Sequence, residues 1–293
     1  MSASFDPRQV RRAFARAAAG YAQAATLQHE VETRLLESLD ALGDRVPAVL
    51  LDVGSGPAHA AQAMRRRWPR ANVLAIDAAL PMLQQARPER WWLRRLPLVR
   101  LCADARALPL VESSVDVLFS SLCLQWLDDL PAVFAGFRRV LKPGGLLLCS
   151  TFGPDTLHEL RAAFAAADDV AHVSPFASMP QFGDALLHAG FRDPVLHRDV
   201  FDLPYPDLPA LMRELRALGA TNALRQRRRT LTGPGRMRAA AASYETLRDE
   251  AGIPATWEVI YAQAFAPPAG QPIRGAGSEV ASVPLSQIPI RRR

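Results

Sequence analysis

The sequence has very little lysine, and this shortage affects how its basic charge is interpreted. Lys142 is the only lysine among 35 basic residues, so arginine carries the net charge of +6. An almost pure arginine content indicates biased coding as much as selection for an anionic partner. No recognised nucleic-acid motif accompanies the charge or the pI of 9.9. The basicity is therefore weak support for an acidic macromolecular partner, and we expect no nucleic acid.

Cysteine is also scarce. Cys102, Cys123 and Cys149 each lie inside an apolar run typical of a strand, with no CxxC spacing and no histidine cluster beside them. Free cysteine behaves as a small apolar residue and is commonly buried. We therefore expect three buried free thiols, no disulfide and no metal site.

Long apolar runs are missing as well. No run approaches the roughly 20 residues that a membrane-spanning helix needs, and the start MSASFDPRQVRRAF lacks the apolar centre of a signal peptide. A chain of 293 residues with 49% hydrophobic content is typical of a soluble globular protein. The sequence therefore predicts a cytoplasmic protein that does not bind a membrane.

Alternating apolar segments indicate a doubly wound α/β fold. Five strand-like runs occupy 48–53, 72–77, 98–103, 115–121 and 145–151, and helical stretches lie near 58–68, 79–87 and 131–141. The strands are almost continuously hydrophobic, as expected when helices cover both faces of a parallel sheet. The proline and two glycines of LKPGG at 141–145 are expected to end the last of these helices.

The last third of the chain predicts a lid and a tail. TLHE at 156–159 and SMPQ at 178–181 fit the capping box, and 194–201 and 256–265 are predicted strands, the second with one less buried face. We expect a helical N-terminal arm (1–42), a cofactor-binding core (43–205), a mainly helical insert (206–255), a final core strand (256–266) and a disordered tail (267–293). The arm and the insert are the material for a lid.

The stretch VLLDVGSGPAH at 49–59 is typical of a nucleotide-binding turn. Gly54 and Gly56 let the main chain pass close to a ligand. A dinucleotide site needs a third glycine, where this chain has His59. The acidic residue two positions before Gly54, Asp52, makes the stretch similar to the first motif of class I S-adenosylmethionine-dependent methyltransferases. In that family a carboxylate at this position suits the ammonium group of the methionine tail.

Later features strengthen this resemblance. Asp77 ends the second strand, where a carboxylate can accept both ribose hydroxyls, and Asp104 in CADA follows the third strand, where the family commonly contacts the adenine amino group. The resemblance implies a Rossmann-like class I methyltransferase fold, with a seven-stranded, mostly parallel sheet and helices on both faces. It implies these cofactor-binding residues: Asp52, Gly54, Ser55, Gly56, Asp77, Ala78, Met82, Asp104, Ala105, Ser121 and Leu122.

Three further segments resemble one narrower family. They are AFARAAAGYAQAATLQ at 13–28, SLCLQW at 121–126 and LMRELRALGATNA at 211–223, and they are similar to the malonyl-acyl carrier protein O-methyltransferases of biotin synthesis. The likeness extends from about residue 8 to residue 265. It implies methyl transfer from S-adenosylmethionine to the free carboxyl group of a malonyl thioester on acyl carrier protein.

The same resemblance suggests roles for individual residues. Tyr21 and Gln28 would close the pocket, and Gln125 and Trp126 would line it from below; packing alone is the alternative for Tyr21 and Trp126. The candidates for gripping the malonyl carboxylate or the carrier phosphate are Arg16, Arg213 and Arg216. We expect one arginine contact, because a tight bidentate pair would weaken the nucleophile. The run RQRRR at 225–229 either docks the acidic carrier or is a solvated face.

Two other functions stay open at this point. FGPDTLHEL at 152–160, HVSPF at 172–176 and PATWEVIY at 254–261 also resemble a methyltransferase-like assembly factor of respiratory complex I, which is understood to hydroxylate an arginine of a partner subunit. A protein that binds S-adenosylmethionine without catalysis is the third possibility. Such a protein would be expected to have a damaged cofactor pocket. Only Ala58, at the position of the usual third glycine of the methyltransferase motif, departs from the pattern.

Overall fold

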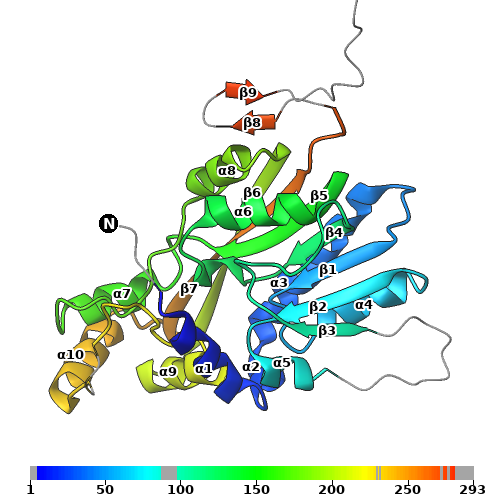
Figure 1. The fold of residues 1–293 in the computed structure, drawn as a ribbon. Coiled ribbons are helices and arrows are strands. Elements are labelled where there is room, and N and C mark those ends of the chain that lie inside the picture. Colours follow the sequence, from blue (N-terminus) through cyan, green and yellow to red (C-terminus); the bar gives the residue numbers. More distant parts are fainter. Residues whose placement is uncertain are drawn as a thin grey trace, which may run out of the picture.

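The computed structural model describes residues 5–86, 98–228, 230, 232–270, 273–275 and 278–280. Its centre is a seven-stranded sheet with the strand order β3-β2-β1-β4-β5-β7-β6 (Figure 1). The strands are Val49–Val53 (β1), Asn72–Asp77 (β2), Val99–Cys102 (β3), Val115–Ser120 (β4), Leu141–Phe152 (β5), Arg192–Tyr205 (β6) and Ile253–Phe265 (β7). The first five strands are parallel, and β7 runs antiparallel to both β5 and β6.

Helices pack on both faces of this sheet (Figure 1). They are Pro7–Ala17 (α1), Tyr21–Ala24 (α2), Thr26–Glu37 (α3), His59–Arg67 (α4), Leu80–Gln84 (α5), Leu130–Val140 (α6), His158–Ala165 (α7), Met179–His188 (α8), Leu208–Ala217 (α9) and Pro234–Glu245 (α10), with short 3-10 helices at Ser38–Leu42 (η1) and Leu124–Trp126 (η2). No helix in the described part of the chain is long and apolar enough to cross a membrane. The sheet and its helices confirm the predicted fold class.

Each central strand sends alternate side chains to two separate cores. In β1, Leu50 packs in the core that contains α3 and α4, while its neighbour Leu51 packs in the core that contains α6 and α8. Phe119 and Leu118 of β4 divide in the same way. Because successive strand side chains point to opposite faces, a strand covered on both sides must be apolar at every position. This requirement explains the continuous hydrophobic runs in the sequence.

Strands β5, β6 and β7 are longer than the sequence predicts. Helix α6 ends at Val140, as expected, but LKPGG already belongs to β5, where Gly144 takes a φ of 71°. Strand β7 is also buried on both faces from Trp257 to Ala262, so the prediction of one less buried face is wrong. The reason is its place in the sheet, since β7 lies between β5 and β6 rather than at an edge.

Of the two predicted capping boxes, only one forms. Ser178 caps α8 with the expected reciprocal bonds to Gln181. At the other site, Thr156 donates its hydroxyl to the Glu258 carbonyl at 3.0 Å, and the Glu159 carboxylate accepts the backbone N–H of Thr256 at 3.1 Å. Both side chains therefore fasten α7 to β7 across the chain, and the capping box predicted there is wrong.

The start of the arm is held by both the core and the insert. The N–H of Phe5 donates to the Asp128 carboxylate of the core at 2.8 Å, and the N–H of Asp6 donates to the Ala223 carbonyl of the insert at 2.8 Å. Arg225 donates to the Phe5 carbonyl at 3.1 Å. Among the described residues of the insert, only α9 and α10 are α-helical, and residues 218–228, 230, 232 and 233 between them are not helical. This joining segment holds the start of the arm.

The end of the chain differs from its prediction. Residues Ile273–Gly275 (β8) and Ser278–Val280 (β9) pair as antiparallel strands, where disorder was expected. The rest of the predicted disordered tail, from residue 281 onward, lies outside the described residues.

Two buried tyrosines, Tyr244 of α10 and Tyr261 of β7, are expected to respond oppositely to the same substitution. The Tyr244 hydroxyl donates to the Pro254 carbonyl at 2.7 Å, whereas the Tyr261 hydroxyl has no hydrogen-bond partner among the described residues. Tyr244→Phe leaves a buried carbonyl unsatisfied and is expected to lower the free energy of unfolding by about 1 to 3 kcal/mol. Tyr261→Phe removes an unpaired polar atom and is expected to be neutral or stabilising. Urea denaturation of both variants measures this, and equal losses would contradict it.

Candidate functional site

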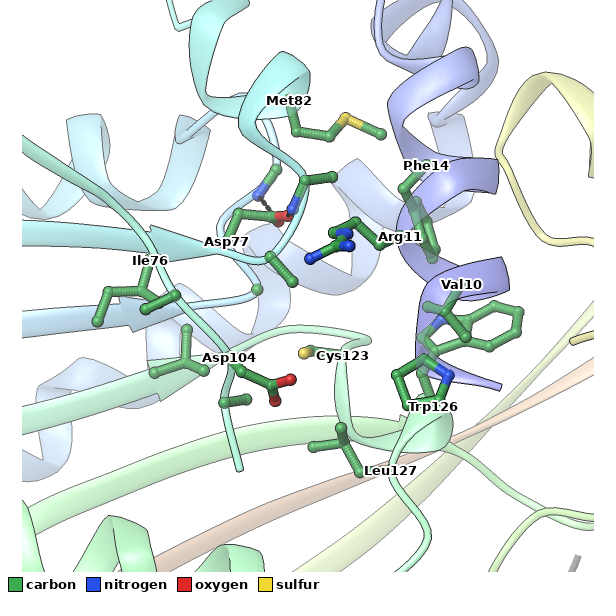
Figure 2. A pocket seen from close by; sticks show the side chains of 18 of the residues that line it. Val10, Arg11, Phe14, Ile76, Asp77, Met82, Asp104, Cys123, Trp126 and Leu127 are labelled. Atoms are coloured by element: carbon green, nitrogen blue, oxygen red, sulfur yellow. Dashed lines mark hydrogen bonds between the residues drawn. The ribbon is translucent and has the colours of Figure 1, made fainter. Parts of the chain in front are cut away.

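A cavity lies at the carboxyl ends of β1, β2, β3 and β4, beneath α1 (Figure 2). Open α/β sheets bind ligands at this edge, where the strand order reverses. The cavity has a volume of about 380 Å³, within the range of small-molecule sites. Its lining comes from the arm (Pro7, Arg8, Val10, Arg11, Phe14, Tyr21) and from the strand ends and their loops (Val53, Gly54, Gly56, Ile76–Ala79, Met82, Cys102–Arg106, Ser121–Cys123, Trp126, Leu127).

The turn after β1 forms one wall and requires its glycines. Gly54 and Gly56 have φ values of 73° and 51°, in the region that favours glycine. A Cβ at Gly54 would lie 2.5 Å from the Sγ atom of Cys123, so the main chain there passes too close to the opposite loop for any side chain. The N–H groups of Gly54 and Ser55 both donate to the Ile76 carbonyl, which ties this turn to β2.

Asp77 connects two backbone turns beside the cavity. One carboxylate oxygen accepts the N–H of Gly56 at 2.9 Å, and the other accepts the N–H of Ala79 at 2.7 Å. Burial raises the pKa of this carboxyl group, and the two backbone bonds oppose that effect. Asp77 therefore lies in the wall with its position fixed from both sides, as Figure 2 shows.

Asp52 has a different position from the one that the sequence suggests. It is buried and does not line the cavity, and its carboxylate accepts the N–H of Ala61 in the first turn of α4 at 3.1 Å. Burial raises the pKa of Asp52 well above its usual range, and the nearby Glu32 adds to the rise. Ser55 is also buried outside the lining. Asp52 therefore anchors α4 below the turn rather than facing a ligand.

Asp104 lies at the end of the cavity beyond β3. Arg106 donates to both of its oxygens, at 2.9 Å and 2.5 Å, and this guanidinium holds the pKa of Asp104 below its usual range. Arg11 adds to the same effect from α1. Arg106 lines the cavity as well, and the sequence analysis missed it. The only sequence feature that could have indicated a role for Arg106 is its position two residues after Asp104, a predicted cofactor-binding residue.

The aromatic residues of the cavity join the arm to the core. Trp126 meets Phe5 and Phe14 edge to face, with ring centroids 5.9 Å and 5.5 Å apart. Trp126 therefore both packs against the arm and lines the cavity. Tyr21 lines it too, and the burial of its phenol raises its pKa above the usual value.

The remaining predicted residues divide into two groups. Ala78, Met82, Ala105, Ser121 and Leu122 line the cavity. The predicted pocket residues Gln28 and Gln125 do not: the Gln125 amide donates to the Leu122 carbonyl at 2.7 Å, and the buried Gln28 side-chain oxygen has no partner among the described residues. Gln125 thus holds the loop in which Leu122 has a φ of 46°.

The three predicted substrate arginines, Arg16, Arg213 and Arg216, are all exposed and lie outside the lining. Two other arginines of α1, Arg8 and Arg11, line the cavity instead. In Figure 2, Arg11 projects from α1 toward Asp77. The signal for it was helical spacing, because Arg11 precedes the apolar residue Phe14 by three positions and so shares its face.

The cysteines and the basic run are used differently from what was expected. Of the three cysteines, only Cys149 is buried. Cys102 is exposed and Cys123 is half-buried, and both of these line the cavity. Desolvation raises the pKa of the Cys123 thiol to about 12, so it stays protonated at neutral pH.

In the basic run, Arg227 pairs with Asp6 at 3.5 Å and Arg228 with Asp168 at 3.4 Å. These two arginines fasten the insert rather than form a free docking face.

Known structures share this fold. The structure of the YcgJ protein of Bacillus subtilis matches with a TM-score of 0.55 and 16% identity, over 80% of this chain and 99% of that one. Phosphoethanolamine N-methyltransferase 2 of Haemonchus contortus, in complex with phosphomonomethylethanolamine and S-adenosylhomocysteine, matches with a TM-score of 0.50 and 17% identity, over 80% of this chain and 52% of that one. At this level of identity they show the fold alone.

Sequence relatives are closer. Residues 51–149 match the family model described as a methyltransferase domain. A malonyl-acyl-carrier protein O-methyltransferase of Xylella fastidiosa is 61% identical over 100% of this chain and 99% of its own length, and one of Methylovorus sp. is 44% identical over 90% of each. The chain therefore belongs to the malonyl-acyl-carrier protein O-methyltransferase family.

Proposed function

We propose that the chain transfers a methyl group from S-adenosylmethionine to the free carboxyl group of malonyl-acyl carrier protein, the ester-forming step of biotin synthesis. Two observations together carry this proposal. The chain has a cavity at the strand ends that suits a methyl donor, and its full-length relatives are named malonyl-acyl-carrier protein O-methyltransferases. The open cavity and its glycine turn argue against the idle binding protein, and the full-length relatives favour methyl transfer over the assembly factor. Cytoplasmic location and the absence of a nucleic-acid partner stay predictions of the sequence.

The cavity suits S-adenosylmethionine at each wall. The Gly54 and Gly56 backbone leaves room where a Cβ would project, which suits the methionine part of the donor. Asp77, half-buried and fixed by two N–H groups, is the acceptor for the ribose hydroxyls. Asp104 and Met82 are left for the adenine end. When bound, the sulfonium of the donor supplies an activated methyl group with a built-in leaving group.

The side chains of the cavity are consistent with a reaction that needs no general base. A malonyl carboxyl group has a pKa of about 4 and is already ionised at neutral pH. Two groups of the lining that could otherwise act as a base or a nucleophile, the Tyr21 phenol and the Cys123 thiol, have raised pKa values and stay protonated. Tyr21 therefore positions a substrate by donating its hydroxyl proton in a hydrogen bond.

The arm would contribute by alignment and by excluding water. Val10 and Phe14 of α1 lie over the strand ends together with Trp126 (Figure 2). Holding the attacking oxygen, the methyl carbon and the sulfur in line can lower a barrier by roughly 7 to 11 kcal/mol. An apolar cover over the reacting atoms also keeps water from competing with the carboxylate.

Helix α1 offers a docking surface for the acidic carrier protein. Its arginines, Arg8, Arg11, Arg12 and Arg16, are all exposed and recur at helical spacing, and the helix contains no acidic residue. Two of them line the cavity, so the same helix faces both the partner and the reaction site. Complementary charge at such a rim speeds association and orients the partner. This surface replaces the basic run 225–229 as our proposed docking site.

Methylation of the carrier substrate is the direct test of the reaction. Incubated with S-adenosylmethionine, malonyl-acyl carrier protein is expected to gain the mass of one methylene unit in intact mass spectrometry. Acetyl-acyl carrier protein has no free carboxyl group and is the matched control, which is expected to stay unchanged. A protein that binds the methyl donor but leaves the malonyl form unchanged would refute the proposed reaction.

The ribose contact is tested separately by Asp77→Asn. This substitution removes a charged acceptor and is expected to weaken binding of S-adenosylmethionine by about 30-fold or more, because hydrogen bonds to a charged group contribute about 1.5 to 3 kcal/mol each. Asp184→Asn, at an exposed residue of α8, is the control. Calorimetry measures both variants after circular dichroism has shown that they are folded. Unchanged affinity in Asp77→Asn would place the ribose elsewhere.

Charge reversal on α1 tests the docking surface. The double substitution Arg12→Glu with Arg16→Glu is expected to raise KM for the carrier substrate about tenfold and to leave kcat within about twofold, since neither residue lines the cavity. Arg66→Glu with Arg70→Glu is the matched control, because both arginines are exposed, at and just after the end of α4, at the opposite edge of the sheet. Steady-state kinetics at low and moderate salt measures the effect. An equal rise in KM in the control would indicate only a change in net charge.

A further inference from the structure

A cluster of three metal-binding side chains lies outside the cavity. His29 and Glu32 occupy α3 three positions apart, on the same face of that helix, and His59 is the first residue of α4. One ligand atom from each lies within 4.8 Å of the other two. The two imidazole rings are 4.7 Å apart between centroids and are tilted by 42°. Helices from the arm and from the core thus bring two histidines and a carboxylate to one point.

From this geometry we propose a divalent metal site, best suited to Zn²⁺, formed by His29, Glu32 and His59. Two imidazoles with one carboxylate are a ligand set that zinc uses in proteins, with water completing the tetrahedron. Zinc bonds of about 2.0 to 2.2 Å require ligand atoms about 3.4 Å apart. The present separations are within reach of that value through small side-chain rotations, since all three residues are only half-buried.

The surroundings of Glu32 are those of an oriented ligand. Its carboxylate accepts the N–H of Ala60, the residue that follows His59. Ligating carboxylates are commonly held by such a second hydrogen bond, which leaves another lone pair for the metal. The same backbone segment therefore supplies one ligand, His59, and fixes another, Glu32.

The proposed site is separate from the methyl-transfer cavity. None of its three residues lines that cavity, so the metal would take no part in the reaction. It would instead join α3 of the arm to α4, the helix that follows the glycine turn. Because a metal that binds only the folded chain stabilises it by mass action, occupancy would hold the arm on the core. This inference does not rest on the proposed function.

Direct titration tests the site. The metal-free full chain is titrated with ZnCl₂ in a calorimeter, and one strong site per chain is expected. His29→Gln and His59→Gln are each expected to weaken binding at least tenfold, since each removes a ligand. His188→Gln is the matched control, because His188 is exposed on α8 and its ring bonds to the Asp184 carbonyl. Cys102→Ser is a second control for an exposed thiol, and it should bind zinc as the unaltered chain does.

Absorption spectra with Co²⁺ and thermal unfolding with Zn²⁺ test the metal site independently of the titration. Co²⁺ in the unaltered chain is expected to show the strong visible absorption of a four-coordinate ion, and the double variant His29→Gln with His59→Gln is expected to lose it. Zn²⁺ should raise the thermal unfolding midpoint of the unaltered chain and not of the double variant. Binding of S-adenosylmethionine, measured without metal, shows that the double variant is folded. Equal zinc binding in that variant, or no stoichiometric binding in the unaltered chain, would overturn the proposal.

Discussion

The arrangement of the cavity depends on the carboxylate of Asp77, which holds two turns that come from different strands. Its bonds to the N–H groups of Gly56 and Ala79 set the distance between the turn after β1 and the turn after β2. The pairing of β1 with β2 stops at Val53 opposite Ile76, and the N–H groups of Gly54 and Ser55 then donate to the Ile76 carbonyl. The bonds of Asp77 continue this connection to Gly56 and Ala79. If Asp77 accepts the ribose hydroxyls as proposed, the affinity for the methyl donor depends on the same side chain that fixes the walls of the cavity. Pre-organised groups of this kind bind without first having to be ordered.

The cover of the cavity has a different origin, because it is built from contacts between distant parts of the chain. Phe5 and Asp6 are held by the core at Asp128 and by the insert at Ala223. Trp126 then packs against the rings of Phe5 and Phe14. The start of the arm is thus positioned by a few edge contacts and one aromatic cluster, whereas α3 of the arm is buried in the core that also contains α4. Regions with few buried contacts open at lower free energy than a sheet core, which suits a cover that must admit both a methyl donor and an acyl chain.

The sequence predicts the core of the fold and much less of its edges. Continuous apolar runs such as β1 and β4 report burial on both faces, so their positions and the α/β class follow directly from the pattern. The paired lengths of β6 and β7 do not, since strand pairing extends through polar and proline residues such as Asp202 and Pro254 that no local preference marks as strand. Likewise, Thr156 and Glu159 fit a local cap, but both are engaged by β7, about a hundred residues later in the sequence.

The site follows the same division. Gly54, Gly56, Asp77 and Asp104 sit at strand ends, where topology alone brings them together, and all four line the cavity. Asp52 belongs to the same motif but does not line the cavity. Successive side chains of β1 point to opposite faces of the sheet, and that of Asp52 points toward α4. Arginines are harder still to place, since a long side chain on a helix reaches a cavity only if the packing of that helix is known.

Charge at the mouth of the cavity must attract a carboxylate without disabling it as a nucleophile. A buried, bidentate guanidinium would hold the acceptor oxygen pair tightly and withdraw its electrons. Arg8 and Arg11 are instead exposed, and Arg106 is already engaged by Asp104 at both oxygens. In water-accessible surroundings, attraction between opposite charges a few ångströms apart falls to about 1 kcal/mol. In the proposed reaction, such weak, solvated cations would suffice to draw an anionic acyl group toward the methyl donor, and they would leave its oxygen free to react.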